Sequence, residues 1–205
     1  MTIFYEFDGK LYANITNKCP CACTFCIRKN SDSVGTNDSL WLEHEPGYDE
    51  IISAFESFDK TDLHELVFCG YGEPMERADT LCDVAKYVKE HSDMKIRINT
   101  NGLAGLINPQ FDINRLSGII DSVSISLNAP DAESYNRVTR PKYGADAYNA
   151  MLSFAKSAKA LVNEVVFTLV DVISEEEIEG CRRKAAELGI PLRIRHYITD
   201  NVKYE

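Results

Sequence analysis

The sequence lacks several features that would place it in a broad class at once. No apolar run reaches the length of a membrane span and the N-terminus shows no targeting pattern, so we expect a cytoplasmic protein with no membrane partner. An excess of positive charge is lacking too: the formal net charge of −10 argues against broad binding to nucleic-acid phosphates. Internal repeats and low-complexity linkers are also missing, which predicts a single domain over residues 1–205.

The cysteines are odd in number, seven in all, and disulfides are rare in reducing compartments, so a disulfide framework is not expected. Four of them form one run, Cys19-Pro-Cys21-Ala-Cys23-Thr-Phe25-Cys26, with no histidine nearby. Without Cys21 the run reads C-x3-C-x2-C, and closely spaced thiolates of this kind ligate four-iron clusters. Three thiolates would leave one iron open to a small molecule. A structural zinc site of all four cysteines is the alternative, although zinc sites usually combine two separated C-x2-C pairs.

Apolar, β-branched segments alternate with helical patterns along most of the chain. The predicted strands are Leu11–Thr16, Glu65–Gly70, Lys95–Asn101, Asp121–Asn128, Val165–Asp171 and Pro191–Ile198. The predicted helices are Tyr48–Phe58, Asp79–His91, Ile113–Ile119, Ala147–Val162 and Ser174–Leu188. Asp8-Gly9, between Phe4–Phe7 and Leu11–Ile15, predicts a short N-terminal β-hairpin. This alternation predicts an α/β fold with a parallel sheet, a partial (β/α)6 TIM-like barrel, because eight units would be tight at this length.

Unusual residues follow four of the predicted strands, at the end where α/β enzymes keep their active sites. The cysteine run follows the first strand and Gly70-Tyr71-Gly72-Glu73-Pro74 follows the second, while Thr100-Asn101-Gly102 and Asn128-Ala129-Pro130 end the next two. Glu73 lies between glycine and proline, so a sharp turn is expected to point its carboxylate into the barrel mouth, where it would suit an ammonium group. An ordinary turn with an exposed glutamate is the alternative.

Three predicted strands carry one polar and one apolar face, and we expect the polar faces to point into the barrel. The polar residues are Arg97, Asn99 and Asn101; Ser124, Ser126 and Asn128; and Arg193, Arg195 and Tyr197. For the last strand, a solvated edge is the alternative. Arg140, Arg193 and Arg195 hint at an anionic group on a substrate, but salt bridges within this acidic chain explain them equally well.

Together these motifs resemble those of the radical SAM superfamily. Cys19, Cys23, Phe25 and Cys26 match its C-x3-C-x-aromatic-C signature, and residues 70–74 match the G-x-GEP form of its GGEP motif. Thr100-Asn101-Gly102 and Ser126-Leu127-Asn128 match its third- and fourth-strand patterns, so the likeness covers nearly the whole chain. A narrower resemblance to TatD-associated radical SAM proteins rests on Leu40–Glu43, Ser126–Asp131, Tyr135-Asn136 and Arg140-Pro141.

The resemblance implies a [4Fe–4S] cluster held by Cys19, Cys23 and Cys26, with S-adenosylmethionine chelated by the remaining iron. One electron, from a donor such as flavodoxin or ferredoxin, would cleave S-adenosylmethionine to methionine and a 5′-deoxyadenosyl radical. That radical would abstract hydrogen from an unidentified substrate. The resemblance also implies further contacts to S-adenosylmethionine. Phe25 would pack by the adenine, and Gly72 and Glu73 would take the methionine ammonium. Ser126 and Asn128, with Asn99 assisting, would hold the ribose or carboxylate, and Gly70 and Asn101 would also line the cofactor site.

Some residues are expected to stand outside this chemistry. Cys21 is interpreted as a spare thiol in the loop, and Cys69, Cys82 and Cys181 as buried small hydrophobes. The polar segment Ile27–Pro46 is expected to order over a cofactor or partner with Trp41 as anchor, unless Trp41 is simply a core residue. Besides an enzyme acting on a small molecule, two readings stay open: an activase acting on a partner protein, and a non-catalytic zinc or iron–sulfur binding module.

Overall fold

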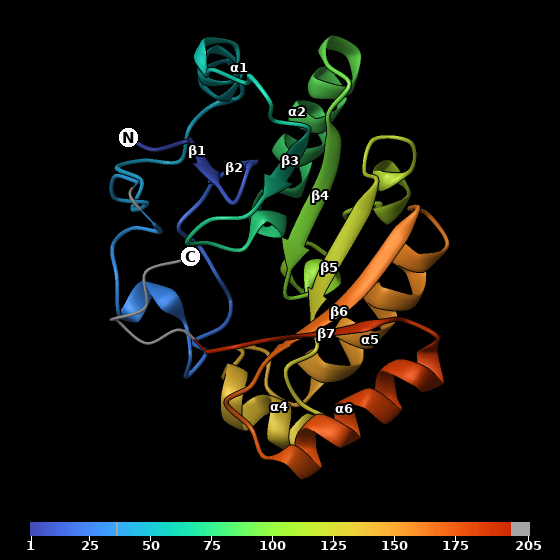
Figure 1. The fold of residues 1–205 in the computed structure, drawn as a ribbon. Coiled ribbons are helices and arrows are strands. Elements are labelled where there is room, and N and C mark those ends of the chain that lie inside the picture. Colours follow the sequence, from blue (N-terminus) through green and yellow to red (C-terminus); the bar gives the residue numbers. More distant parts are fainter. Residues whose placement is uncertain (36, 198–205) are drawn as a thin grey trace.

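The computed structural model describes residues 1–35 and 37–197, and its centre is one seven-stranded sheet in the order β1-β2-β3-β4-β5-β6-β7 (Figure 1). The strands are β1 (Phe4–Phe7), β2 (Lys10–Ala13), β3 (Glu65–Phe68), β4 (Lys95–Thr100), β5 (Ser122–Ser126), β6 (Glu164–Val170) and β7 (Leu192–Arg195). β1 pairs antiparallel with β2, and every later pairing is parallel. Six parallel strands in sequence order confirm the predicted partial TIM-like barrel.

Helices follow most strands and pack on the outer face of the sheet. They are α1 (Tyr48–Ser57), α2 (Ala78–His91), α3 (Ala104–Ile107), α4 (Ala132–Thr139), α5 (Asp146–Lys159) and α6 (Glu175–Leu188), with the 3-10 turns η1 (Ile27–Lys29), η2 (Pro74–Arg77) and η3 (Ile113–Leu116). Figure 1 shows α5 and α6 beside β6 and β7: α5 contacts β6, and α6 contacts β7. None of the helices in the described part is long and apolar enough to span a membrane.

The two faces of the sheet differ as the alternation of residues predicts. Leu66, Ile96 and Ile98 on the outer face are fully buried in the core beneath the helices. The opposite, concave face carries Arg97 and Ser124, whose strand neighbours on either side belong to that core. The polar residues of these strands therefore lie inside the barrel, as predicted.

The N-terminal hairpin forms at the predicted turn. Asp8 and Gly9 both have positive φ, 51° and 64°, the conformation that a two-residue hairpin turn with right-handed twist requires. Ser174 caps α6 by accepting from the Glu177 backbone N–H, while the Glu177 side chain bonds back to Ser174, so the predicted capping box is present.

Some predicted elements were wrong. The helix predicted over Ile113–Ile119 is only the 3-10 turn η3, because the chain turns at Gly118, whose φ is +77°. The short helices α3 and α4 were missed, since four and eight residues hold too few turns for a periodic pattern. The last strand, predicted to Ile198, ends at Arg195, and Ile198 itself lies outside the described residues.

Candidate functional site

The loops that follow β2, β3 and β4 meet at the carboxyl ends of their strands. The backbone N–H of Glu73 donates to the carbonyl of Lys18 at 2.7 Å, which joins the second loop to the first. Gly72 permits this approach, because a Cβ atom there would lie 2.2 Å from the Thr16 carbonyl oxygen. Gly70 is similarly close to the first loop, since its Cβ would lie 2.1 Å from Asn14 Oδ1. Both glycines therefore allow the loop of residues 14–26, which we call the cysteine loop, to contact the loop of residues 69–74, which we call the GEP loop.

Glu73 ties the second loop to the end of β4. Its Oε1 accepts from Thr100 Oγ1 at 2.6 Å and from the Met75 N–H at 3.1 Å, and its Oε2 accepts from the Asn101 N–H at 2.7 Å. The residue is only 4% exposed, so the alternative of an ordinary turn with an exposed glutamate is wrong. Burial raises the pKa of this carboxyl to about 8, although its hydrogen bonds lower it. Oε2 still has one free acceptor position among its described contacts.

The thiols of Cys19, Cys21 and Cys23 shift one another's pKa values. A hydrogen bond from Cys21 lowers the pKa of Cys19 to about 6 and also lowers the pKa of Cys23. The pKa of Cys21 is raised, because its proton is held by the thiolates of Cys19 and then Cys23. Burial raises the pKa of Cys26, and the nearby Arg28 guanidinium opposes this rise. Cys19 and Cys23 thus favour the thiolate form, which is the form that binds metal.

Cys21 is not a thiol of an open loop, because it is only 5% exposed. Its Sγ lies 3.8 Å from Asn101 Nδ2, and its backbone forms an isolated bridge with Pro141. Cys21 therefore occupies the centre of the cysteine run and contacts the end of β4.

A segment far along the chain holds the cysteine loop in place. The Thr24 N–H donates to the Val138 carbonyl at 2.9 Å, and the Lys142 N–H donates to the Pro20 carbonyl at 2.8 Å. Arg28 binds the loop from the other side, since its guanidinium donates to the carbonyls of Asn17, Cys21 and Tyr71. The loop is thus fixed by backbone contacts that do not require the thiols themselves.

The donor set fits an iron–sulfur cluster. Cys19, Cys23 and Cys26 are free and partly accessible, and a guanidinium lies near all three. Among the described residues, no three His, Cys, Asp or Glu side chains converge as the ligands of a single metal ion do. Thiolates that bind different irons of one cluster have no need to converge on one point.

The other residues predicted to contact a cofactor lie at two places. Asn99, Asn101 and Ser126 are on the concave face at the ends of β4 and β5, and the buried Asn128 follows in a left-handed conformation with φ 55°. Asn99 Oδ1 is buried without a hydrogen-bond partner in the described structure, so this acceptor is available to a ligand. Phe25 instead packs against the core from within the cysteine loop. The structure brings the concave-face residues near the GEP loop through Asn101.

Sequence reasoning missed residues that support the site. Thr100 bonds Glu73, and Asn14 Nδ2 donates to the Leu40 carbonyl at 2.7 Å while its Oδ1 accepts from the Tyr71 N–H. No spacing rule singles out a lone Asn that bonds distant backbone groups, and the strand motif that contains Thr100 does not indicate that its hydroxyl bonds Glu73. Arg28 did offer a signal, because a cation two residues after the last cysteine stabilises thiolates.

Two interpretations outside the cysteine run need correction. Cys82 and Cys181 are buried in the core as predicted, but Cys69 is half-buried at the end of β3, where burial raises the pKa of its thiol and the neighbouring Asn99 opposes this rise. Trp41 is 39% exposed, so the alternative of core burial is wrong. Its indole N–H donates to Asp32 at 2.9 Å, and its ring packs edge-on against Tyr71. Trp41 therefore connects its own segment, residues 27–46, to the GEP loop.

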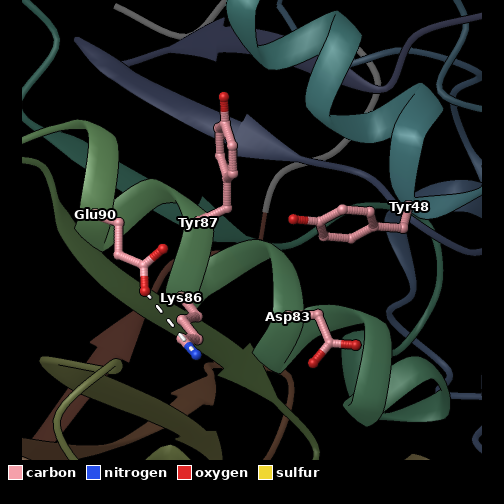
Figure 2. A pocket seen from close by; sticks show the side chains of 5 residues that line it. All are labelled: Tyr48, Asp83, Lys86, Tyr87 and Glu90. Atoms are coloured by element: carbon pink, nitrogen blue, oxygen red, sulfur yellow. Dashed lines mark ion pairs between the residues drawn. The ribbon is translucent and has the colours of Figure 1, made fainter.

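A surface pocket of about 330 Å³ lies elsewhere, between α1 and α2 (Figure 2). Tyr48 comes from α1, while Asp83, Lys86, Tyr87 and Glu90 line it from α2. None of the residues predicted to hold the cluster or contact the cofactor lines this pocket, so it is separate from the candidate site.

The chain matches the family model of the radical SAM superfamily over residues 13–185, and it belongs to that family. A [4Fe–4S] cluster and S-adenosylmethionine are therefore its cofactors. Among curated proteins it is 29% identical over 130 residues to a probable GTP 3′,8-cyclase of Methanocaldococcus jannaschii, covering 63% of this chain and 40% of that protein. The chain thus spans about two fifths of the length of this relative.

Solved structures share the fold. A radical SAM methyltransferase from Sphaerobacter thermophilus matches with a TM-score of 0.66 and 14% identity, covering 94% of this chain and 68% of that one. SuiB of Streptococcus suis, bound to S-adenosylmethionine, matches with a TM-score of 0.62 and 16% identity, covering 95% of this chain and 40% of that one. SuiB has also been solved with its precursor peptide SuiA, and that structure matches with a TM-score of 0.62 and 14% identity over 93% of this chain and 41% of that one. At these identities the likeness establishes the architecture alone.

Proposed function

We propose that this protein is a radical SAM enzyme in which Cys19, Cys23 and Cys26 hold the cluster. The observation that carries the proposal is the junction of three strand-end loops, where Glu73 links Lys18 of the cysteine loop to Asn101, which follows β4. Such a junction places thiolates, a carboxylate and backbone carbonyls on one rim. When bound, the reduced cluster supplies the electron that cleaves S-adenosylmethionine to methionine and a radical able to remove hydrogen from a substrate.

The chain's own residues bind and orient S-adenosylmethionine. The remaining acceptor position on Glu73 Oε2 and the carbonyls of the GEP loop would hold the methionine ammonium. Asn99 Oδ1, which has no described partner, and Ser126 would accept from or donate to the ribose or carboxylate. The buried, left-handed Asn128 would shape this end of the site.

The reaction and substrate follow from this site only in outline. The precursor-peptide complex of SuiB makes a peptide or protein one candidate substrate class, and an activase acting on a partner protein would belong to it. The cyclase relative makes a nucleotide the other candidate. Membership among TatD-associated radical SAM proteins stays a prediction. Arg140 and Pro141 of that pattern lie directly against the cysteine loop at Ala22 and Cys21.

Anaerobic cleavage of S-adenosylmethionine tests the proposal. Protein reconstituted with iron and sulfide, then given dithionite and S-adenosylmethionine, should release 5′-deoxyadenosine, detected by mass spectrometry. Cys26→Ala should release none, whereas Cys181→Ala, which removes a core thiol distant from the cysteine run, should match wild type. One zinc per chain with no bound sulfide, together with equal loss of metal in Cys21→Ala and Cys26→Ala, would instead establish a zinc module.

A further inference from the structure

Three arginines gather on the concave face of the sheet, at the open side of the barrel. Arg97 lies on β4, and Arg193 and Arg195 lie two residues apart on β7, so both β7 side chains share one face. Leu192 and Ile194, their neighbours on β7, pack against the core beneath the helices. The guanidinium groups therefore point away from the helices and into the barrel.

The three cations act on one another and on one phenol. Partial desolvation lowers the pKa of Arg193, and the charges of Arg97 and then Arg195 lower it further. Burial and then the thiol of Cys69 raise the pKa of Tyr12 on β2, whereas Arg97 and Arg195 lower it. Tyr12 pairs with Val67 of β3, and Val67 pairs with Arg97, so Tyr12 and Arg97 lie on the same concave face as the β7 arginines.

Positive charge in this space is incompletely balanced. Glu65 forms an ion pair with Arg97: Oε1 lies 3.3 Å from Nε, and Nη2 donates to Oε2 at 3.4 Å. The buried Nε–H itself has no aligned acceptor in the described residues. Within the described part of the chain, no carboxylate forms an ion pair with Arg193 or Arg195. Arg193 and Arg195 are exposed on this face, so an anion from solvent can reach both guanidinium groups.

We propose that Arg97, Arg193 and Arg195, with the Tyr12 hydroxyl, form an oxyanion-binding site that holds a phosphate or carboxylate group of the substrate. Guanidinium groups bind both kinds of anion through paired hydrogen bonds, and a phenol adds a neutral donor. The site borders Cys69 and Asn99 at the end of β3 and β4, next to the proposed cofactor residues. The role of this site in binding a substrate rests on the proposed function. Its binding of an anion can be measured without any reaction.

The test is calorimetric titration of the reconstituted protein with inorganic pyrophosphate and, separately, with succinate. The double variant Arg193→Gln/Arg195→Gln should lose about tenfold or more in affinity, because each charge-assisted contact is lost. The matched control, Arg182→Gln/Arg183→Gln, removes the same charge from exposed positions on α6 and should bind like wild type. Thermal melting of both variants checks that they fold.

The outcomes separate the source of the anion and the two proposals. Binding of pyrophosphate alone identifies a phosphate site, binding of succinate alone a carboxylate site, and binding of both a general oxyanion site. No binding by wild type, or equal loss in the two double variants, overturns the inference. Release of 5′-deoxyadenosine by a wild type that binds neither anion would refute this site and leave the proposed function standing. Anion binding without S-adenosylmethionine cleavage would support the anion site and refute the proposed function.

Discussion

At the scale of single residues, Cys21 shows how a thiol outside the signature changes the chemistry of its neighbours. Its proton stabilises the thiolates of Cys19 and Cys23, and Asn101 lies against its sulfur. A residue that sequence reasoning treats as spare is thus part of the ligand environment. Removing it should alter the reactivity of the ligands without removing a ligand.

Alkylation of cluster-free protein measures this effect. In wild type, the rate of Cys19 alkylation by iodoacetamide should rise with a midpoint near the pKa of about 6 that the Cys21 hydrogen bond gives this thiol. Cys21→Ala removes the donor, so the pKa of Cys19 should rise and the midpoint should shift to higher pH. Peptide mass spectrometry follows the residue, and Cys82→Ala on α2 is the control. Equal midpoints in all three proteins would contradict the predicted hydrogen bond.

Glu73 should give the cluster-free protein a characteristic pH dependence. Its pKa is about 8 when folded, against an ordinary value of 4.5 when unfolded, so between these values the folded state binds more protons. The free energy of unfolding should therefore fall as pH rises from about 4.5 to about 8, by up to about 1.4 kcal/mol per pH unit. Glu73→Gln should flatten this slope in urea titrations at several pH values. The exposed Glu133→Gln should keep it, and a slope unchanged by Glu73→Gln would show that another group causes it.

At the scale of elements, the strand-end loops are joined through close backbone contacts rather than through large side chains. Gly72→Ala would place a methyl group 2.2 Å from the Thr16 carbonyl oxygen and 2.7 Å from that of Lys18. Since both obstacles are backbone, the two loops must separate, and we expect a loss of about 1–3 kcal/mol in the free energy of unfolding. Gly105→Ala on α3 meets nothing within 4 Å and should be neutral or slightly stabilising. The urea midpoints of the two variants measure the difference in stability. Equal midpoints would show that the two loops can separate at Gly72 without loss of stability.

The elements also show what the sequence could and could not predict. Period-two alternation predicted the polar concave faces of β4 and β5, because one residue type on one face is a local property. The burial of the Glu73 carboxylate could not be predicted, since the motif gives the turn but not the Thr100 and Asn101 donors brought from the end of β4. The contact between residues 20–24 and 138–142 was likewise beyond prediction, because it joins segments more than a hundred residues apart.

At the scale of the whole molecule, the site joins segments from both halves of the chain, so its ligands should stabilise the entire fold. The cysteine loop contacts the GEP loop, the end of β4 and the segment after α4, and these elements cannot unfold while a ligand bridges them. S-adenosylmethionine that binds only the folded, cluster-loaded protein should add about 2.7 kcal/mol at about a hundred times its dissociation constant. Thermal melting of anaerobically reconstituted wild type should therefore shift upward with S-adenosylmethionine. Cys26→Ala, which lacks one proposed cluster ligand, should show no shift, whereas Cys181→Ala should respond like wild type. An equal shift in Cys26→Ala would mean that S-adenosylmethionine is held by the protein alone, and the open iron site would have no part in its binding.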